Sequence, residues 1–178
     1  MKDLDEQMAD WRDSVSLQSR AYDLQKITKN LKEFQKLFHK THSLIDVGCG
    51  VGSIYEFLGR PINYIGVDIN QEEVRHAQRR FPDARFEVCD LFDLELKADW
   101  ILCCRVLMHV PSPLKAIETL KRCGRVVLIV PVSTNALAKD SFTGGFTYFR
   151  TFSRDTLEQA GSCRIYQHVP YSTVVYDA

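Results

Sequence analysis

The chain has 178 residues, of which 45% are hydrophobic and 26% are charged, a composition that is typical of a globular domain and excludes a disordered or fibrous protein. Lysine and arginine together number 23, as do aspartate and glutamate, so the net charge of zero excludes a general electrostatic attraction to nucleic acid or to an anionic membrane. No stretch approaches the roughly 18 apolar residues of a membrane-spanning helix, and we expect neither a membrane segment nor a secretory signal.

Six cysteines are spread through the chain without a Cys-x-x-Cys pair, at positions 49, 89, 103, 104, 123 and 163. Several fall within apolar runs, where a free thiol behaves as a small hydrophobic side chain. We therefore expect a reduced, cytoplasmic protein with no metal site and no disulfide framework.

The first predicted element is an amphipathic helix over residues 24–39. Its apolar side chains recur at helical spacing, namely Leu24, Ile27, Leu31, Phe34 and Phe38. Lysines fall on the opposite side of the helical wheel, at positions 26, 29, 32, 36 and 40. This stripe is typical of a solvated helix face, and a nucleic-acid-binding patch is the alternative.

Short apolar runs and helical patterns alternate after this helix. We predict strands at residues 44–47, 64–68, 85–88, 100–104 and 126–130. Between them we predict a short helix ending near Gly59, a helix whose capping box is Asn70 and Glu73, and a helix from Ser112 to Gly124.

The C-terminal part contains a capped helix from Ser153 to Gly161 and two strands, near 164–168 and 173–176, which form a hairpin around Pro170. This alternation predicts an α/β fold, a doubly wound and mostly parallel seven-stranded sheet with helices on both faces and a C-terminal antiparallel hairpin. In such a sheet ligands bind beyond the carboxyl ends of the strands, where the strand order reverses.

Glycines follow the first predicted strand in the segment Asp46-Val47-Gly48-Cys49-Gly50-Val51-Gly52. Alternate glycines allow a tight turn and a close approach of a ligand to the backbone. A dinucleotide-binding loop would have its third glycine at position 53, which here is Ser53. The loop and the acid before it therefore favour a ligand without a pyrophosphate.

This segment resembles the class I S-adenosylmethionine-dependent methyltransferases, whose glycine-rich motif has the form D-x-G-C-G-x-G, and the resemblance extends over residues 44–131. It implies a Rossmann-like methyltransferase fold, S-adenosylmethionine as the cofactor and S-adenosylhomocysteine as the product. It also implies that Gly48, Cys49 and Gly50 lie against the amino-acid end of the cofactor. Asp46 would hold the loop and reach the methionine ammonium group through water.

Acids close the second and third predicted strands. Asp68 would accept hydrogen bonds from both ribose hydroxyls, and Ile69 would form a wall for the adenine. By the resemblance, Asp90 lies close to the adenine amino group and Leu91 against the ring. An aspartate at the end of a strand also commonly serves only as a helix cap, and this alternative stays open for both acids.

The fourth strand opens into Arg105-Val106-Leu107-Met108-His109-Val110-Pro111, which is similar to the V-L-x-H-V segment of the family beside the methyl group. On this basis Arg105 is a candidate for cofactor binding. His109 is the candidate general base, because imidazole titrates near neutral pH and a base is needed only if the acceptor must lose a proton. The alternative is a structural histidine.

Two segments are candidates for a substrate lid, with Trp11 and Tyr22 in one and Phe146 and Tyr148 in the other. The alternative is that these aromatic side chains only complete the core. We expect a single domain over residues 1–178, composed of an N-terminal helical segment or lid (1–42), a cofactor-binding core (43–131), a substrate-side loop (132–152), and a C-terminal helix and hairpin (153–178).

The sequence thus predicts an enzyme that moves the methyl group of S-adenosylmethionine to a small-molecule acceptor by in-line displacement, mainly through positioning. The chain lacks the D/N-P-P-Y motif and the Pro-Cys pair of methyltransferases that act on nucleic-acid bases, which disfavours nucleic-acid acceptors. Three alternatives stay open: a methyltransferase for RNA or another macromolecule acting through the lysine stripe, a noncatalytic protein that binds S-adenosylmethionine, and a nicotinamide oxidoreductase, against which Ser53 argues.

Overall fold

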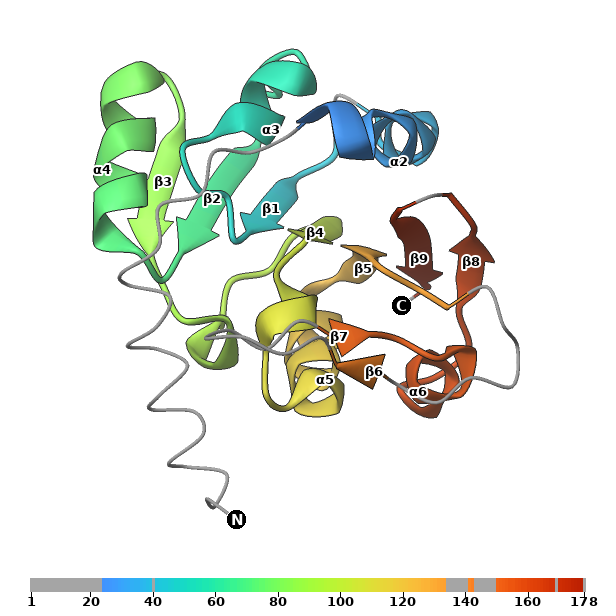
Figure 1. Cartoon of the computed structure of the whole chain (residues 1–178). Helices are drawn as coiled ribbons and strands as arrows, with labels where there is room; N and C mark the ends of the chain where they lie inside the picture. Colours follow the sequence, from blue (N-terminus) through green and yellow to red (C-terminus); the bar gives the residue numbers. More distant parts are fainter. Residues whose placement is uncertain (1–23, 40, 134–140, 143–149, 169, 178) are drawn as a thin grey trace.

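The computed structural model describes residues 24–39, 41–133, 141–142, 150–168 and 170–177, and its centre is a seven-stranded sheet in the order β3-β2-β1-β4-β5-β9-β8 (Figure 1). The strands are β1 (Leu44–Val47), β2 (Tyr64–Asp68), β3 (Arg85–Val88), β4 (Trp100–Cys104), β5 (Arg125–Val130), β8 (Arg164–Tyr166) and β9 (Ser172–Tyr176). The first five are parallel, and β8 and β9 form the antiparallel C-terminal hairpin. The predicted fold class is confirmed.

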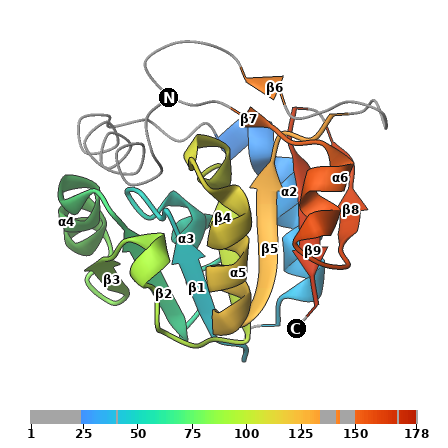
Figure 2. The same cartoon turned by 90° about the horizontal axis from the view of Figure 1, so that it is seen from below.

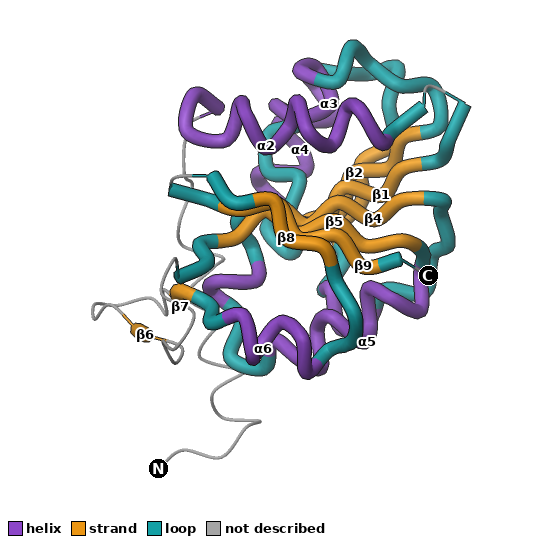
Figure 3. Tube along the Cα trace, turned by 90° about the vertical axis from the view of Figure 1, so that its right-hand side faces the viewer, coloured by secondary structure: helices purple, strands orange, loops and turns teal. Residues whose placement is uncertain are grey.

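Helices cover both faces of this sheet. They are α2 (Leu24–Leu37), α3 (Ser53–Phe57), α4 (Gln71–Arg80), α5 (Pro113–Cys123) and α6 (Arg154–Gln159), with the 3-10 turns η1 (Leu91–Asp93) and η2 (Leu107–His109). Figure 3 shows α2, α3 and α4 on one face and α5 and α6 on the other. None of the helices in the described part of the chain is long and apolar enough to cross a membrane.

Strand order reverses beside β1, which pairs in parallel with β2 on one side and β4 on the other, so that Ile45 lies opposite both Ile65 and Ile101. The chain runs from β1 outward through β2 and β3, and then returns to form β4 and β5 on the other side. The loops that follow β1 and β4 therefore diverge and leave room for a ligand at the carboxyl ends of these strands.

Helix α2 buries the predicted apolar stripe, including Ile27, Leu31 and Phe34, but the same face also buries a polar residue. The Asn30 side chain donates hydrogen bonds to the Tyr171 carbonyl oxygen at 2.9 Å and to the Thr173 hydroxyl at 3.1 Å. These two bonds join α2 to the start of β9. The lysines at positions 26, 29, 32 and 36 are exposed, and position 40 lies outside the described residues.

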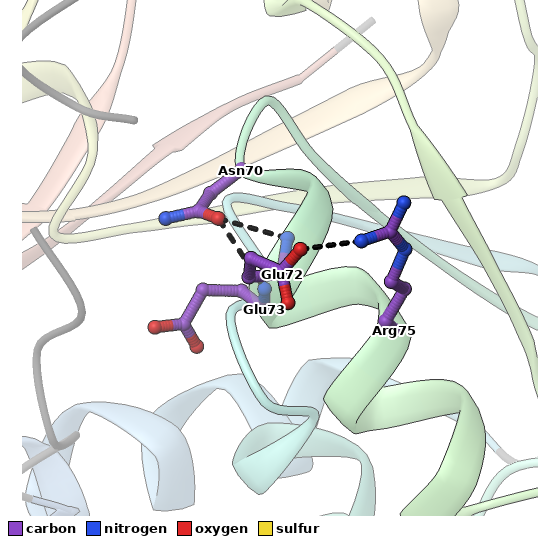
Figure 4. A network of polar contacts seen from close by, with 4 residues as sticks. All are labelled: Asn70, Glu72, Glu73 and Arg75. Carbon is purple, nitrogen blue, oxygen red and sulfur yellow. Dashed lines mark hydrogen bonds and ion pairs between the residues drawn. The ribbon is translucent and has the colours of Figure 1, made fainter. Parts of the chain in front are cut away.

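The ends of the helices follow the predicted signals in most cases. The Asn70 side chain accepts hydrogen bonds from the amides of Glu72 and Glu73 at the start of α4 (Figure 4). Ser112 forms no such side-chain bond within the described part of the chain. Gly124 ends α5 in an extended conformation, and a Cβ there would lie 2.1 Å from the Ala98 carbonyl oxygen. Close packing, rather than a left-handed cap, requires that glycine.

The connection after β5 contains two short strands that the sequence did not predict, β6 (Ser141–Phe142) and β7 (Arg150–Thr151). After β7 the chain returns to the carboxyl end of β5, where the Phe152 amide donates to the Pro131 carbonyl at 2.8 Å. Figure 2 shows β7 close to the arrowhead of β5. Strands of two residues carry no periodicity, which is why the sequence analysis treated this part as a loop.

Candidate functional site

The loop after β1 turns tightly because its glycines adopt positive φ values, 75° at Gly48 and 51° at Gly50. The Gly48 amide donates to the Val67 carbonyl at 2.8 Å, which holds the loop against β2. A Cβ at Gly48 would lie 2.0 Å from a methyl carbon of Val106, the residue that follows Arg105 after β4. The loops after β1 and β4 thus meet at the point where the strand order reverses.

Asp68, at the end of β2, is joined directly to this loop. Its two carboxylate oxygens accept hydrogen bonds from the amides of Gly50 and Asn70, both at 2.9 Å. Burial raises the pKa of Asp68, while hydrogen bonds from the backbone amides of Asn70, Gly50 and Ile69 act in the opposite direction. Each carboxylate oxygen has about two acceptor sites, so Asp68 retains the capacity to bind a further donor.

Asp46 lies beneath the loop and is fully buried. One of its oxygens accepts a hydrogen bond from the Tyr64 hydroxyl at 2.7 Å, and the other has no hydrogen-bond partner among the described residues. Burial raises the pKa of Asp46 to about 7, the hydrogen bond from Tyr64 lowers it, and the charge of Asp68 raises it further. The described partner of this acid is therefore a tyrosine on β2 rather than a loop amide.

A third carboxylate, which the sequence analysis treated only as part of a capping box, also borders the loop. Glu73, in the first turn of α4, is 9% exposed, and a Cβ at Gly50 would lie 3.6 Å from one of its carboxylate oxygens. Figure 4 shows its side chain directed away from Arg75, which pairs with Glu72. With Asp68 it makes the surroundings of the loop acidic, an arrangement that attracts a cation.

Cys49 is the only side chain between the first two glycines of the loop, and it is buried. Burial raises the pKa of its thiol well above the usual value, and the charges of Asp46, Asp68 and Glu73 act in the same direction. The thiol therefore stays protonated and is a poor nucleophile. All six cysteines of the chain are free, and the described residues contain no cluster of histidine, cysteine and acidic side chains suited to a metal ion.

The end of β3 lies beside the end of β2, since the Cys89 amide donates to the Asp68 carbonyl at 3.0 Å. The Asp90 carboxylate accepts a hydrogen bond from the Phe92 amide at 3.0 Å and so caps η1. Leu91 is buried and Ile69 is half-buried. The structure thus brings Asp68 and Asp90 to neighbouring strand ends, and both also serve as local backbone caps.

Arg105 follows β4 in a left-handed conformation with a φ of 60°, and its amide donates to the Ile129 carbonyl at 2.8 Å. The guanidinium carbon lies 5.2 Å from the centre of the Tyr171 ring, at the start of β9. The side chain therefore extends toward β9, whereas Val106 contacts the glycine loop. The sequence did not indicate this direction, because Tyr171 lies 66 positions further along the chain and comes close to Arg105 only when the chain is folded.

His109 ends η2 and is half-buried, and its amide donates to the Val106 carbonyl at 2.9 Å. The turn η2 packs against α5, β5 and β7. The candidate lid residues Trp11, Tyr22, Phe146 and Tyr148 lie outside the described residues.

Residues 45–126 match a family model that is described as a methyltransferase domain. No curated protein sequence matches the chain.

Several solved structures share the fold. The 1,6-didemethyltoxoflavin-N1-methyltransferase of Burkholderia thailandensis, with bound 1,6-didemethyltoxoflavin and S-adenosylhomocysteine, has a TM-score of 0.70 and 17% identity, covering 98% of this chain and 89% of that one. The magnesium protoporphyrin IX methyltransferase of Synechocystis, with bound S-adenosylhomocysteine, has a TM-score of 0.65 and 19% identity, covering 94% and 92%. The (4+2)-cyclase SpnF has a TM-score of 0.66 and 19% identity, covering 83% and 62%.

Proposed function

We propose that this chain, whose residues 45–126 match a methyltransferase domain model, transfers the methyl group of S-adenosylmethionine to a small-molecule acceptor. The observation that carries this proposal is the contact between the glycine loop and Asp68, whose carboxylate accepts the Gly50 amide at 2.9 Å. It joins a backbone turn that a ligand can approach closely to an acid suited to ribose hydroxyls, at the point where the strand order reverses.

The residues around the loop fit S-adenosylmethionine. Gly48 and Gly50 present backbone without side chains, and the buried Asp46 has one carboxylate oxygen with no partner among the described residues. The acidic surroundings, to which Asp68 and Glu73 contribute, suit a cofactor with an ammonium group and a sulfonium centre. We assign the loop to the amino-acid end and Asp68 to the ribose.

The adenine is assigned to the ends of β2 and β3. Asp90 would accept a hydrogen bond from the adenine amino group, and Ile69 and Leu91 would form apolar walls for the ring. Support comes from the adjacent strand ends, because the Cys89 amide donates to the Asp68 carbonyl at 3.0 Å. The Asp90 carboxylate also caps η1, because it accepts the Phe92 amide.

When bound, the cofactor supplies a methyl group that its sulfonium centre already makes electrophilic. The protein mainly has to hold the acceptor in line with that group and exclude water. Such positioning lowers the activation free energy by about 7–11 kcal/mol. His109 would act as the general base where the acceptor must lose a proton. Its place in η2, against β5 and β7, supports this assignment.

A small-molecule acceptor is supported by the Burkholderia thailandensis methyltransferase, whose structure contains such a molecule and resembles nearly the whole of this chain. The free thiols favour a reducing compartment such as the cytoplasm.

The second candidate function is that of a noncatalytic or differently reactive binding protein, which the shared fold of the cyclase SpnF favours. A macromolecular acceptor would use the exposed lysines of α2.

Calorimetric titration of the purified chain tests the proposal, with S-adenosylmethionine, S-adenosylhomocysteine and oxidised nicotinamide dinucleotide as ligands. We expect micromolar binding of the first two and none of the third. Binding of the dinucleotide alone would contradict the proposal. Binding of S-adenosylmethionine without its consumption, across a set of small-molecule acceptors, would favour the noncatalytic alternative.

A further inference from the structure

Glu73, in the first turn of α4, has a buried carboxylate without a partner. The residue is only 9% exposed, and its carboxylate forms neither a hydrogen bond nor an ion pair with the part of the chain that the structure describes. Arg75 pairs with the exposed Glu72 instead, and Figure 4 shows the Glu73 side chain directed away from that arginine. An unpaired buried charge destabilises the folded chain, which points to a partner from outside the chain.

The helix cap does not account for this glutamate. In a complete capping box the Glu73 side chain would accept the backbone amide of Asn70. Here Asp68 accepts that amide at 2.9 Å, whereas the Asn70 side chain accepts the Glu73 amide at 3.3 Å. Only one half of the box is formed, and the Glu73 carboxylate remains available at the N-terminus of α4, where the helix dipole favours a negative charge.

The Glu73 carboxylate lies beside the second glycine of the loop. A Cβ at Gly50 would lie 3.6 Å from one of its oxygens, and its negative charge contributes to raising the pKa of the Cys49 thiol. The Gly50 amide is itself fixed by Asp68 at 2.9 Å. A small cationic group that contacts the loop backbone at Gly50 is therefore within reach of Glu73.

The other acids at the loop are less suited to bind a cation. Asp46 is fully buried beneath the loop, and burial raises its pKa to about 7, so that it is protonated in a large share of the molecules at neutral pH. Asp68 already accepts two backbone amides and is assigned to the ribose. Glu73 is thus the carboxylate at the loop that neither function uses.

We propose that Glu73 binds the α-ammonium group of the methionine part of the cofactor and so fixes the amino-acid end against the glycine loop. This inference rests on the proposed function, because it takes S-adenosylmethionine as the ligand. The ammonium group is common to S-adenosylmethionine and S-adenosylhomocysteine, whereas the sulfonium centre belongs to the first alone. Glu73 should therefore contribute to the affinity for both.

Calorimetric titration of the full chain tests this with three ligands: S-adenosylmethionine, S-adenosylhomocysteine and a deaminated S-adenosylhomocysteine that has hydrogen in place of the ammonium group. Glu73→Gln, which removes the charge and keeps the size, should weaken binding of the first two at least tenfold. The affinity for the deaminated ligand should change less than about twofold, because the group that Glu73 binds is already missing. The wild type should bind the deaminated ligand at least tenfold more weakly than S-adenosylhomocysteine.

Glu72→Gln is the matched control, because Glu72 is an exposed glutamate in the same turn of α4, and all three affinities should equal those of the wild type. If Glu73→Gln does not fold, Glu73→Asp replaces it, with an expected loss of at least threefold for the two ligands that carry the ammonium group. An equal loss for the deaminated ligand, or equal wild-type affinities for S-adenosylhomocysteine with and without its ammonium group, would overturn the inference. A loss confined to S-adenosylmethionine would also overturn it, because Glu73 would then act on the sulfonium centre.

The same titrations separate this inference from the proposed function. If the wild type binds neither S-adenosylmethionine nor S-adenosylhomocysteine, the proposed function fails, and the role of Glu73 fails with it. If the wild type binds both and Glu73→Gln binds them equally well, only the present inference fails.

Discussion

At the scale of single residues, Asp68 is the most important residue of the proposed cofactor site. Its carboxylate accepts hydrogen bonds from backbone amides of both the glycine loop and the start of α4. We predict that Asp68→Ala weakens S-adenosylmethionine binding at least tenfold, since a hydrogen bond to a charged acceptor contributes about 1.5–3 kcal/mol. Calorimetric titration measures the change. Asp155→Ala, an exposed acid at the start of α6, is the control and should bind normally. Unchanged affinity in Asp68→Ala would refute the ribose assignment.

Asp46 makes stability depend on pH. The folded state keeps this carboxyl protonated up to a pKa of about 7, whereas an unfolded chain releases the proton near the ordinary value of 3.8. Between these values the folded state binds more protons, so the free energy of unfolding falls as the pH rises through that window. Above this pH window the whole loss in the free energy of unfolding has occurred, and it is on the order of 4 kcal/mol.

We therefore predict that Asp46→Asn loses less stability than the wild type between pH 5 and pH 8, by on the order of 2–3 kcal/mol. Urea unfolding at both pH values measures this difference. Tyr64→Phe, which removes the hydrogen bond to Asp46, should steepen the dependence because that bond lowers the pKa of Asp46. Parallel pH profiles for the wild type and Asp46→Asn would show that Asp46 does not titrate in this window.

At the scale of elements, the loop after β1 depends on the absence of a side chain at Gly48. We predict that Gly48→Ala lowers the free energy of unfolding by more than the roughly 1–2 kcal/mol of a left-handed alanine, because its Cβ would lie 2.0 Å from Val106. Val106→Ala in the same chain should relieve the excess, which denaturant unfolding measures as a double-mutant cycle. Gly59→Ala is the matched control, with a φ of 78° and no atom within 4 Å of the new Cβ.

Helix α2 depends on one buried polar side chain. Asn30→Ala leaves the Tyr171 carbonyl without its donor at 2.9 Å, and we predict a loss of about 1–3 kcal/mol in the free energy of unfolding. Gln25→Ala, on the exposed side of the same helix, should change stability by less than about 0.5 kcal/mol. Similar losses in both variants would mean that the helix docks by its apolar stripe alone.

The five parallel strands were predicted well, and their bounds agree with the prediction to within one residue. Strand β4 and most of β5 appear as apolar runs because helices cover both sides of the sheet, and the shorter strands were bounded by turn residues. In the site, the glycine loop, Asp68 and Asp90 could be predicted because strand ends are fixed by the same pattern. The neighbours Glu73, Val106 and Tyr171 could not, since each reaches the site through packing between distant segments.

At the scale of the whole molecule, one sheet joins two halves, with β1, β2 and β3 on one side of β4 and β5, β9 and β8 on the other. The acidic side chains of Asp68 and Glu73 lie beside the glycine loop in the first half, which suits a cationic cofactor, while the net charge of the chain is zero. Strand β4 pairs with β1 on one side and β5 on the other, so both halves share their central strands. The buried hydrophobic side chains that the structure describes form one core cluster, which both halves share.

This shared core leads to a prediction for the single-domain organisation of the chain. We expect one cooperative transition in denaturant, because the loss of either half exposes β4 and β5, which are almost fully buried. Fluorescence of Trp100, packed edge-on against Phe34 of α2, reports the region around β4, and far-ultraviolet circular dichroism reports the whole chain. The measurement uses Trp11→Phe, so that Trp100 is the only tryptophan. Coincident curves would support one domain over residues 1–178, whereas an earlier fluorescence transition would show that α2 and the amino ends of the central strands unfold separately from the rest.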